Sequence, residues 1–291
     1  MVASRAGTID LDDAYAVCVR DARRHYENFP VASLLLPREM RRDVAAVYAF
    51  ARAADDFADE GDRSVDDRHR LLDGWLHRLR QAAGSDKPGP DPRPGEPPNS
   101  QAIFRALGAS IRSRQLPVTL LEDLLSAFRQ DVTVAQYEQW PHLLDYCRRS
   151  ANPVGRLVLR IAGYRDIRLD TWSDAVCTAL QLTNFWQDLS VDLARGRSYL
   201  PEQEVRAHGT REAALAAAVR RTRAFFDAGR PVCDAVRGRL RYELRATWLG
   251  GVRILDRVER SLPGAIGKRP TLGPLDAPWL VARLLTWSRV P

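Results

Sequence analysis

The sequence lacks the features that mark membrane-spanning and exported proteins. Its 291 residues contain no stretch approaching 18 uninterrupted apolar residues, so no bilayer-spanning helix is predicted. The opening residues VASRAGTIDLDD have no apolar core of the signal-peptide kind. We therefore expect a cytoplasmic protein, with peripheral attachment at the inner face of the membrane as the alternative location.

Cysteine is scarce and widely spaced. No C-x-x-C pair and no histidine cluster at zinc spacing is present, and the four cysteines are Cys18, Cys147, Cys177 and Cys233. This spacing favours buried, reduced thiols over a zinc site or a disulfide scaffold.

Acidic residues are outnumbered by basic ones. The formal net charge is +7, carried largely by arginine, in a chain that is 45% apolar and 28% charged. That balance is ordinary for a globular protein and excludes global disorder. The excess of arginine favours solubility, or attraction to an anionic lipid surface or a diphosphate. Because no recognition motif and no basic block with interleaved aromatics is present, we predict no nucleic-acid partner.

Alternating β-type segments and hairpin dipeptides are missing, and the apolar periodicity is helical almost everywhere. Within 44–55 it follows i, i+3, i+4 and i+7, so Asp55 continues the buried face of a helix that starts after Pro37. Further helices are predicted at 10–27, 64–83, 101–114, 117–131, 139–150, 153–164, 168–194, 210–237 and 240–260. The sequence therefore predicts an all-α protein.

One segment interrupts the helical pattern. Ser85 to Ser100 (SDKPGPDPRPGEPPNS) is so rich in proline and glycine that no packed element is expected there. A domain boundary would explain it, but neither flank makes a self-sufficient core. We therefore predict a surface loop within a single domain covering 1–291.

The segment Trp279 to Trp287 (WLVARLLTW) is short, apolar and interrupted by one arginine. We predict that it packs in the core, with shallow membrane contact as the alternative.

Two aspartate pairs at helical spacing are the most informative feature of the chain. Asp55 and Asp59 lie in RAADDFADE, and Asp188 and Asp192 lie in QLTNFWQDLSVD. Four residues of helix return to nearly the same face, so each pair presents two carboxylates side by side. Such carboxylates repel each other unless a cation lies between them, and Mg²⁺ prefers hard oxygen ligands together with substrate phosphates. The two pairs, 133 positions apart (188 − 55), therefore predict the two walls of a diphosphate-binding cavity.

The second pair belongs to a longer polar stripe. Gln181, Asn184, Asp188 and Asp192 fall at steps of 3, 4 and 4, and apolar residues border the stripe on both sides. Unpaired buried carboxylates are costly, so a cation must meet them. That cation is a metal ion or, alternatively, an arginine of this chain. The first pair, taken alone, is more typical of a solvated helix end, and the two pairs together carry the specificity.

Four segments resemble the squalene/phytoene synthase family of head-to-head prenyl synthases. They follow the family's order and spacing over nearly the whole chain, and they read LLPREMRRDVAAVYAFARAADDFADE, DYCRRSANPVG, QLTNFWQDLSVD and GRSYLP. The resemblance implies a single-domain helical bundle of the isoprenoid synthase type with a central cavity. It also implies that two or three Mg²⁺ ions and a diphosphate bind at the cavity mouth, while apolar walls hold the prenyl chains.

The resemblance also implies roles for individual residues. The implied metal ligands are Asp55, Asp59, Asn184, Asp188 and Asp192. The implied catalytic residues, which face the diphosphate or the reacting carbocation, are Tyr48, Arg52, Tyr146, Gln181, Phe185, Arg197 and Tyr199. The implied substrate-binding residues are His25, Asn28, Phe29, Asn184 and Gln187.

Two departures from the family pattern narrow the implied function. The family segment N-I-L-R-D-V-x-E-D reads NFWQDLSVD here, so Gln187 replaces an arginine and Val191 replaces a glutamate. The family segment Ser-x-Ser-Phe is represented by HYENF, so Asn28 stands where a serine normally helps to hold diphosphate. HYENFPVAS and NFWQD are similar to the hydroxysqualene synthase branch, which acts in the bacterial route to squalene used for hopanoids.

The resemblance therefore implies an Mg²⁺-dependent conversion of presqualene diphosphate to hydroxysqualene, in which diphosphate leaves and water captures the cation. We expect no NADPH requirement, and we expect other enzymes of the squalene pathway as partners. One alternative is a complete squalene or phytoene synthase that condenses two prenyl diphosphates. The other is a catalytically silent binding or assembly protein of the same fold, against which the four intact aspartates argue.

Overall fold

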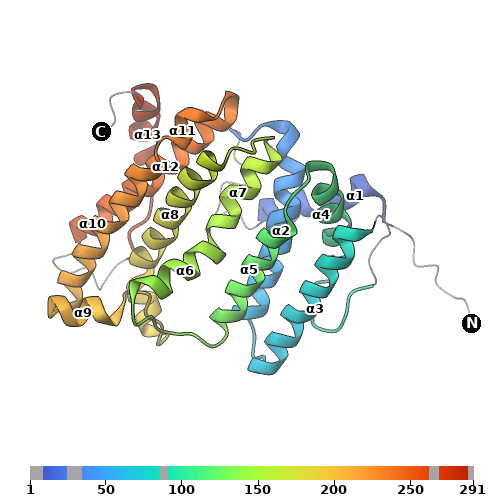
Figure 1. Ribbon diagram of the computed structural model, residues 1–291, viewed down its shortest axis with the longest axis horizontal. Helices are drawn as coiled ribbons and strands as arrows, with labels where there is room; N and C mark the ends of the chain where they lie inside the picture. Colours follow the sequence, from blue (N-terminus) through green and yellow to red (C-terminus); the bar gives the residue numbers. More distant parts are fainter. Residues whose placement is uncertain (1–8, 25–34, 86–90, 262–268, 288–291) are drawn as a thin grey trace, which may run out of the picture. The chain divides into compact units, whose positions relative to one another are not determined.

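The computed structural model describes residues 9–24, 35–85, 91–261 and 269–287, and within these ranges the regular elements are helices (Figure 1). The prediction of an all-α fold is confirmed. In the described part of the chain, no helix is both long and apolar enough to cross a membrane. The chain forms two compact units, Met1–Thr133 with Leu157–Tyr164, and Val134–Arg156 with Arg165–Pro291. The single-domain organisation stays a prediction.

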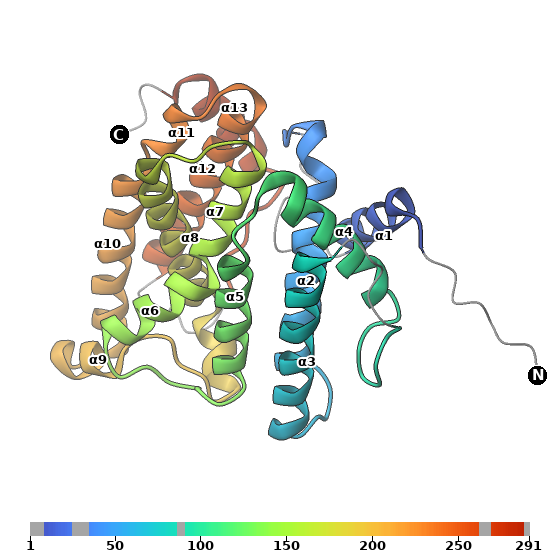
Figure 2. The same ribbon diagram turned by 45° about the vertical axis from the view of Figure 1, so that its right-hand side comes forward.

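The first unit is organised around helix α2. Its elements are α1 (Leu11–Arg24), the 3₁₀ helix η2 (Arg38–Met40), α2 (Arg41–Asp59), α3 (Val65–Gly84), α4 (Ser100–Arg114) and α5 (Val118–Asp131). Pro37 precedes η2, which leads directly into α2, as expected for a helix start. Helix α2 contacts α1, α3, α4 and α5, so neighbouring helices cover it on several sides (Figure 2).

Aromatic rings fill the core between α2, α3 and α4. Trp75 stacks on Phe50 at 6.0 Å between ring centroids and meets the edge of Phe104 at 4.4 Å. The Trp75 indole N–H donates to the Phe50 carbonyl at 3.2 Å, so burial leaves no polar group of this ring unsatisfied. These contacts fix the middle of α2, with Phe50 five residues before Asp55.

A buried carboxylate ties three helices of this unit together. Asp43 on α2 accepts hydrogen bonds from the Ser110 hydroxyl at 2.8 Å and the Tyr15 hydroxyl at 3.2 Å, from α4 and α1. Arg114 completes the set with an ion pair at 2.8 Å. Because a buried charge without partners is costly, these contacts specify how α1 and α4 pack on α2.

The proline-rich segment between α3 and α4 contains only turns, bends and irregular backbone over residues 91–99, as expected for a surface loop. Residues 86–90 lie outside the described residues, but Glu96 is buried and forms an ion pair with Arg78 of α3. The Glu96 carboxylate also accepts the Arg93 backbone N–H at 3.0 Å. A single charged residue, rather than apolar area, therefore anchors this loop to α3.

The second unit is built around helix α8. Its elements are α6 (Trp140–Ser150), α7 (Asn152–Ile161, whose last residues belong to the first unit), α8 (Ile167–Ala194), α9 (Glu202–His208), α10 (Arg211–Gly229), α11 (Val232–Ala235), α12 (Gly238–Ser261) and α13 (Asp276–Leu285). Helix α8 contacts α6, α10, α11 and α12. A Cβ at Gly251 would lie 2.5 Å from Leu180, so glycine permits the close approach of α12 to α8.

Most predicted helix bounds agree with the structure to within a few residues. The predicted helix 210–237 is wrong as one element, because α10 ends at Gly229 and α11 begins after Pro231. Proline has no N–H to continue the backbone ladder, which explains the break. Helix α9 was not predicted.

The prediction that Trp279 to Trp287 packs in the core is also largely wrong. Trp287 is buried, but Val281 and Leu285 are 57% and 82% exposed. Helix α13 presents these apolar residues to solvent.

Candidate active site

The first aspartate pair lies in the last turns of α2, around Arg52. The Arg52 guanidinium lies 3.5 Å from Asp55 Oδ2, 2.7 Å from Asp56 Oδ1 and 2.9 Å from Glu60 Oε1. Positions three and four residues apart on a helix are neighbours, which brings Asp55 and Asp56 to this arginine. One guanidinium therefore serves three carboxylates, and negative charge remains in excess.

The pKa values of this site reflect that excess. Burial, followed by the like charge of Asp59, raises the pKa of Asp55 from its ordinary value of 3.8 to about 6, against the opposing effect of Arg52. Burial also raises the pKa of the Tyr48 hydroxyl, one turn before Arg52 on α2. A carboxyl whose charged form is disfavoured by a neighbouring carboxylate gains most from an added cation. This donor set fits Mg²⁺.

An arginine of α3 holds the end of α2 in place. Arg68 donates hydrogen bonds to the carbonyls of Phe57 at 3.1 Å, Ala58 at 2.5 Å and Gly61 at 2.7 Å. The last carbonyls of a helix have no intrahelical partner, so this side chain satisfies them and fixes the turn that carries Asp59.

A cavity of about 510 Å³ lies in the first unit beside the predicted catalytic residues of α2. Tyr48, Arg52 and Asp56 line it from α2, and Glu96 and Asn99 line it from the segment before α4. The cavity therefore gives the phenol and the guanidinium access to a bound molecule. Its described lining does not include the metal-ligand candidates of α2.

The polar stripe of α8 is partly open. Gln181, Asp188 and Asp192 are half-buried and Asn184 is exposed. Arg269 forms an ion pair with both oxygens of Asp188, including one hydrogen bond of 3.1 Å from Nη2 to Oδ2. An arginine of this chain therefore meets Asp188, as one of the two predicted kinds of cation would, and the metal-ligand role of Asp188 stays a prediction. Nothing in the spacing indicated Arg269, which is 81 positions away along the chain.

The segment that carries Arg269 makes a second contact with α8. The Gln187 side-chain amide donates to the Pro270 carbonyl at 2.5 Å. Residues 269 and 270 therefore lie along the turn of α8 that holds the first aspartate of the second pair.

Three predicted catalytic residues of the second unit meet in one aromatic cluster. Tyr199 stacks on Phe185 with ring centroids 3.8 Å apart and an angle of 3° between the planes. Tyr146 of α6 lies 6.1 Å from Phe185 and 6.2 Å from Tyr199. Aromatic faces attract cationic groups, and in this cluster Tyr146 and Phe185 are buried while Tyr199 is half-buried.

Tyr137 belongs to the same cluster and was not predicted. Its ring lies 5.7 Å from both Tyr146 and Tyr199. It precedes α6 in a stretch with no helical periodicity, so no spacing signal could single it out. Its position follows instead from backbone pairing, because Glu202 donates its N–H to the Tyr137 carbonyl at 3.0 Å.

The end of α8 places Arg197 and Tyr199 directly after the second aspartate pair. Gly196 adopts a φ of +76°, which glycine tolerates better than other residues, and ends the helix. The Arg197 N–H then donates to the Asp192 carbonyl at 2.8 Å, and the Ser198 N–H to the Ala135 carbonyl at 2.8 Å. These backbone contacts set the register of the GRSYLP segment against the segment before α6.

The described residues contain no group of three or more His, Cys, Asp or Glu side chains arranged to hold a metal ion. Each compact unit contributes one carboxylate pair. Because Mg²⁺ commonly binds one or two carboxylates plus waters and substrate phosphates, such pairs suit an ion that arrives with a diphosphate. The metal-ligand roles stay predictions, and the predicted residues His25, Asn28 and Phe29 lie outside the described residues.

Comparison with known proteins identifies the family. The family described as squalene/phytoene synthase matches residues 22–273. The chain belongs to the squalene/phytoene synthase family. Hydroxysqualene synthase of Zymomonas mobilis is 39% identical over 188 residues, which are 63% of this chain and 57% of that protein. Hydroxysqualene synthase of Sinorhizobium fredii is 37% identical over 201 residues, which are 68% of this chain and 63% of that protein.

The matched region thus spans less than two thirds of the length of these members of the squalene/phytoene synthase family. Squalene synthase HpnC from Alicyclobacillus acidocaldarius has a TM-score of 0.77 at 38% identity, with 87% of this chain and 95% of that chain covered. A dehydrosqualene synthase has a TM-score of 0.80 at 19% identity, covering 96% and 98% of the two chains, and shows the fold alone. The predicted isoprenoid synthase type of fold is confirmed.

Proposed function

We propose that this member of the squalene/phytoene synthase family converts presqualene diphosphate to hydroxysqualene with the help of Mg²⁺. The observation that carries the proposal is the arrangement along α8. Asp188 lies three positions after Phe185, whose ring is stacked on Tyr199 in the aromatic cluster. Helix α8 thus carries both a carboxylate pair, which suits a metal-bound diphosphate, and an aromatic ring of the cluster, which suits a carbocation.

The four aspartates and Asn184 would hold the metal ions, and Mg²⁺, when bound, neutralises the departing diphosphate. Arg52 and Arg197 bind its oxygens, since guanidinium groups match phosphate geometry. When the carbon–oxygen bond breaks, the remaining cation rearranges against the rings of Phe185, Tyr146 and Tyr199.

A water molecule then adds to the cation and loses a proton, which yields the alcohol and inorganic diphosphate. We propose that the side-chain amides of Gln181 and Gln187 on α8 orient that water. No hydride donor enters this sequence, so we propose that NADPH is not required. Catalysis in the cytoplasm beside other enzymes of the squalene pathway stays part of the same proposal.

A complete squalene synthase is the second candidate. The relative named squalene synthase HpnC covers more of this chain than the hydroxysqualene synthases do, at nearly the same identity. Such an enzyme would join two farnesyl diphosphates and reduce the product. The non-catalytic alternative has no such support, because both aspartate pairs are intact.

The test is to incubate the purified protein with presqualene diphosphate and Mg²⁺, with and without NADPH, in ¹⁸O-labelled water. We expect labelled hydroxysqualene at the same rate in both reactions, and no product from the Asp188→Asn variant. Squalene formed only with NADPH would contradict the proposal and favour the second candidate. Phytoene formed from geranylgeranyl diphosphate would contradict both.

A further inference from the structure

The four rings of the aromatic cluster differ in how much of their surface is open. Tyr137, Tyr146 and Phe185 are only 3%, 5% and 4% exposed, whereas Tyr199 is half-buried. Tyr199 therefore offers more surface to a bound molecule than any other ring of the cluster. The contacts that hold this ring in place decide which aromatic face such a molecule meets.

The main chain around Tyr199 is fixed by the segment before α6 rather than by a helix. Tyr199 lies between α8 and α9, outside the regular elements. The Ser198 N–H donates to the Ala135 carbonyl at 2.8 Å, and the Glu202 N–H donates to the Tyr137 carbonyl at 3.0 Å. These bonds hold the backbone on both sides of Tyr199, but they leave its side chain a choice among staggered rotamers.

Neighbouring rings select the rotamer of Tyr199. Its ring stacks on Phe185 with centroids 3.8 Å apart and an angle of 3° between the planes. A single stacked pair is a weak restraint, so this contact alone would let the ring slide. Tyr137 stacks on Tyr199 at 5.7 Å with 24° between the planes, and Tyr146 lies 6.2 Å away. These two contacts restrict the movement that remains.

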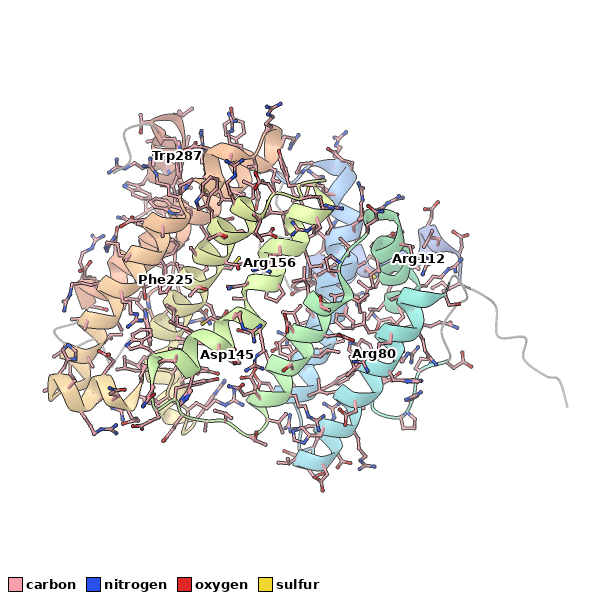
Figure 3. All side chains as sticks on the ribbon, viewed as in Figure 1. Arg80, Arg112, Asp145, Arg156, Phe225 and Trp287 are labelled. Atoms are coloured by element: carbon pink, nitrogen blue, oxygen red, sulfur yellow. The ribbon has the colours of Figure 1, made fainter. Side chains whose placement is uncertain are left out.

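Tyr146 is held in the cluster by α6. Figure 3 labels the preceding residue, Asp145, on this helix, and its side chain is 50% exposed and accepts a hydrogen bond from Arg148 Nη2 at 2.8 Å. Successive residues of a helix point in directions about 100° apart, so Tyr146 is turned away from that exposed side. Helix geometry therefore accounts for the position of Tyr146, whereas Tyr137 precedes the helix and needs other contacts.

Tyr137 combines a backbone contact and ring contacts with the Tyr199 segment. Its carbonyl accepts the Glu202 N–H, and its ring lies 5.7 Å from both Tyr199 and Tyr146. Because Tyr137 is 3% exposed, its ring has almost no surface of its own for a substrate. Any effect of Tyr137 on a reaction must therefore act through the rings that it touches.

We infer that Tyr137 is a positioning residue, which keeps the Tyr199 ring flat against Phe185 where the reacting cation meets the cluster. The inference rests on the proposed function, which supplies the cation. Without the Tyr137 ring, Tyr199 turns away and water reaches the cation before its rearrangement is complete. Water then bonds to the carbon that diphosphate has left and loses a proton, which gives the unrearranged cyclopropylcarbinyl alcohol and inorganic diphosphate.

The first experiment measures the position of the ring without any reaction. The full chain is prepared with 3-fluorotyrosine at position 199, and its ¹⁹F resonance is recorded without substrate. We expect Tyr137→Leu to move this resonance toward that of free 3-fluorotyrosine, and Tyr137→Phe, which keeps the ring, to leave it in place. The matched control is Phe226→Leu, which removes a fully buried ring that packs on Trp248 outside the cluster and should not move the resonance.

The second experiment measures kcat, KM and products with presqualene diphosphate and Mg²⁺. For Tyr137→Leu we expect kcat to fall about 10-fold while KM changes less than about 2-fold, because Tyr199 acts on the cation rather than on substrate binding. The cyclopropylcarbinyl alcohol should form a larger share of the product. Tyr137→Phe should restore both kcat and the product ratio, and Phe226→Leu should keep the product ratio of the wild type.

Tyr137→Met, whose flexible side chain refills the space, is the second variant should Tyr137→Leu fail to fold, and circular dichroism melts monitor both. An unmoved ¹⁹F resonance in the folded variant would overturn the inference. So would a product ratio equal to that of Phe226→Leu, because the loss of the ring would then act through stability alone. A wild type that makes no hydroxysqualene contradicts the proposed function instead, and the ¹⁹F comparison then decides whether Tyr137 positions Tyr199.

Discussion

The two aspartate-bearing helices, α2 and α8, neutralise their charge in opposite ways. On α2, Arg52 of the same helix pairs with Asp55 and with acidic neighbours within eight positions. On α8, Asp188 pairs with Arg269, which is 81 positions away. The first arrangement follows from the spacing of residues along α2. The second depends on tertiary packing that brings Arg269 next to α8.

This difference has a consequence for the binding of cations. Arg52 is shared among several carboxylates, so Asp55 keeps a raised pKa and an unmet demand for positive charge. Asp188 has an arginine of its own. If the pairs bind metal ions as proposed, we expect an ion to join Arg52 at the first pair and to displace Arg269 at the second.

The largest expected effect is on turnover. Asp55→Asn and Asp188→Asn each remove one ligand charge from the proposed diphosphate site, and we expect turnover to fall by about 10³-fold in both variants. Steady-state assays with presqualene diphosphate at saturating Mg²⁺ measure this, while circular dichroism should stay helical. Asp73→Asn is the matched control, because it removes an exposed carboxylate of α3 whose ion pair is with Arg129. Near wild-type turnover in either active-site variant would rule out a two-walled metal site.

The reactivity of the cysteine thiols can be compared between the unit that contains α2 and the unit that contains α8. Burial raises the pKa of Cys18 in the first unit to about 12, and of Cys147, Cys177 and Cys233 in the second to about 12, 11 and 12. At pH 8 we expect all four to react with Ellman's reagent at least about 100-fold more slowly than free cysteine, because the thiolate fraction is that much smaller. Labelling followed by peptide mass spectrometry identifies which thiol reacts first. If Cys18 and the other three become reactive together in denaturant, the two units unfold as one.

The same shifts predict the alkaline limit of stability. Below about pH 9 these thiols are protonated in both the folded and the unfolded protein, so they add no pH dependence to the free energy of unfolding. As the pH rises from 9 toward 12 only the unfolded thiols ionise, and the free energy of unfolding falls. Denaturant midpoints measured from pH 8 to pH 11 should therefore fall. A flat profile would show that the thiols are not buried.

The local features of the site could be predicted from sequence, and the non-local ones could not. Helical periodicity placed Asp55 beside Arg52, and it placed Phe185 and Asp188 on one helix. Contacts within a few residues follow from helix geometry alone. Tyr137 and Arg269 were missed, because each reaches the site through tertiary packing that leaves no trace in spacing.

Charge explains the other failures of prediction. Glu96 was overlooked because the surrounding prolines indicate a loop, yet one buried ion pair with Arg78 is enough to hold the segment. The apolar face of α13 was expected inside because hydrophobicity usually decides burial. The buried carboxylate of Asp276, which pairs with Arg253 and Arg257, decides it here and turns that face outward.

Smaller effects, on the free energy of unfolding, are expected at the C-terminal ends of α2 and α8. Arg68→Met removes hydrogen bonds to three carbonyls at the end of α2, so we expect the free energy of unfolding to fall by about 1–3 kcal/mol. Gly196→Ala forces a side chain into a left-handed turn after α8 and should cost about 1 kcal/mol. Arg70→Met is the control, because Arg70 is exposed and pairs with neighbouring Asp67. Equal melting curves for the Arg68 and Arg70 variants would show that α2 needs no arginine at its end.

The different charge environments of Asp55 and Asp188 predict that removing the two charges changes the free energy of unfolding in opposite directions. The folded pKa of Asp55 is raised to about 6, so its ionised form opposes folding once the pH exceeds that value. At pH 7.5 Asp55→Asn should therefore stabilise the protein by about 1 kcal/mol, a value reduced for solvent screening because the side chain is 41% exposed. Asp188→Asn should destabilise it by a similar amount, because Arg269 loses its partner. Urea denaturation without Mg²⁺ distinguishes the two, and changes of the same sign would contradict the comparison.

The smallest expected effect isolates Arg269. If this guanidinium occupies the position at which a metal ion meets Asp188, then Mg²⁺ must displace it, and Arg269→Gln should bind Mg²⁺ about 5-fold more tightly in the absence of substrate. Isothermal titration calorimetry measures the affinity directly, without reference to turnover. Arg260→Gln is the matched control, since it removes one arginine of α12 that donates to the Asp256 carbonyl, and it should leave the affinity unchanged. Arg52→Gln should also tighten binding, but by less, because several carboxylates share that one charge and each loses only part of it. If Arg269→Gln weakens Mg²⁺ binding instead, Arg269 does not compete for the site, and its ion pair serves to orient Asp188 toward the metal.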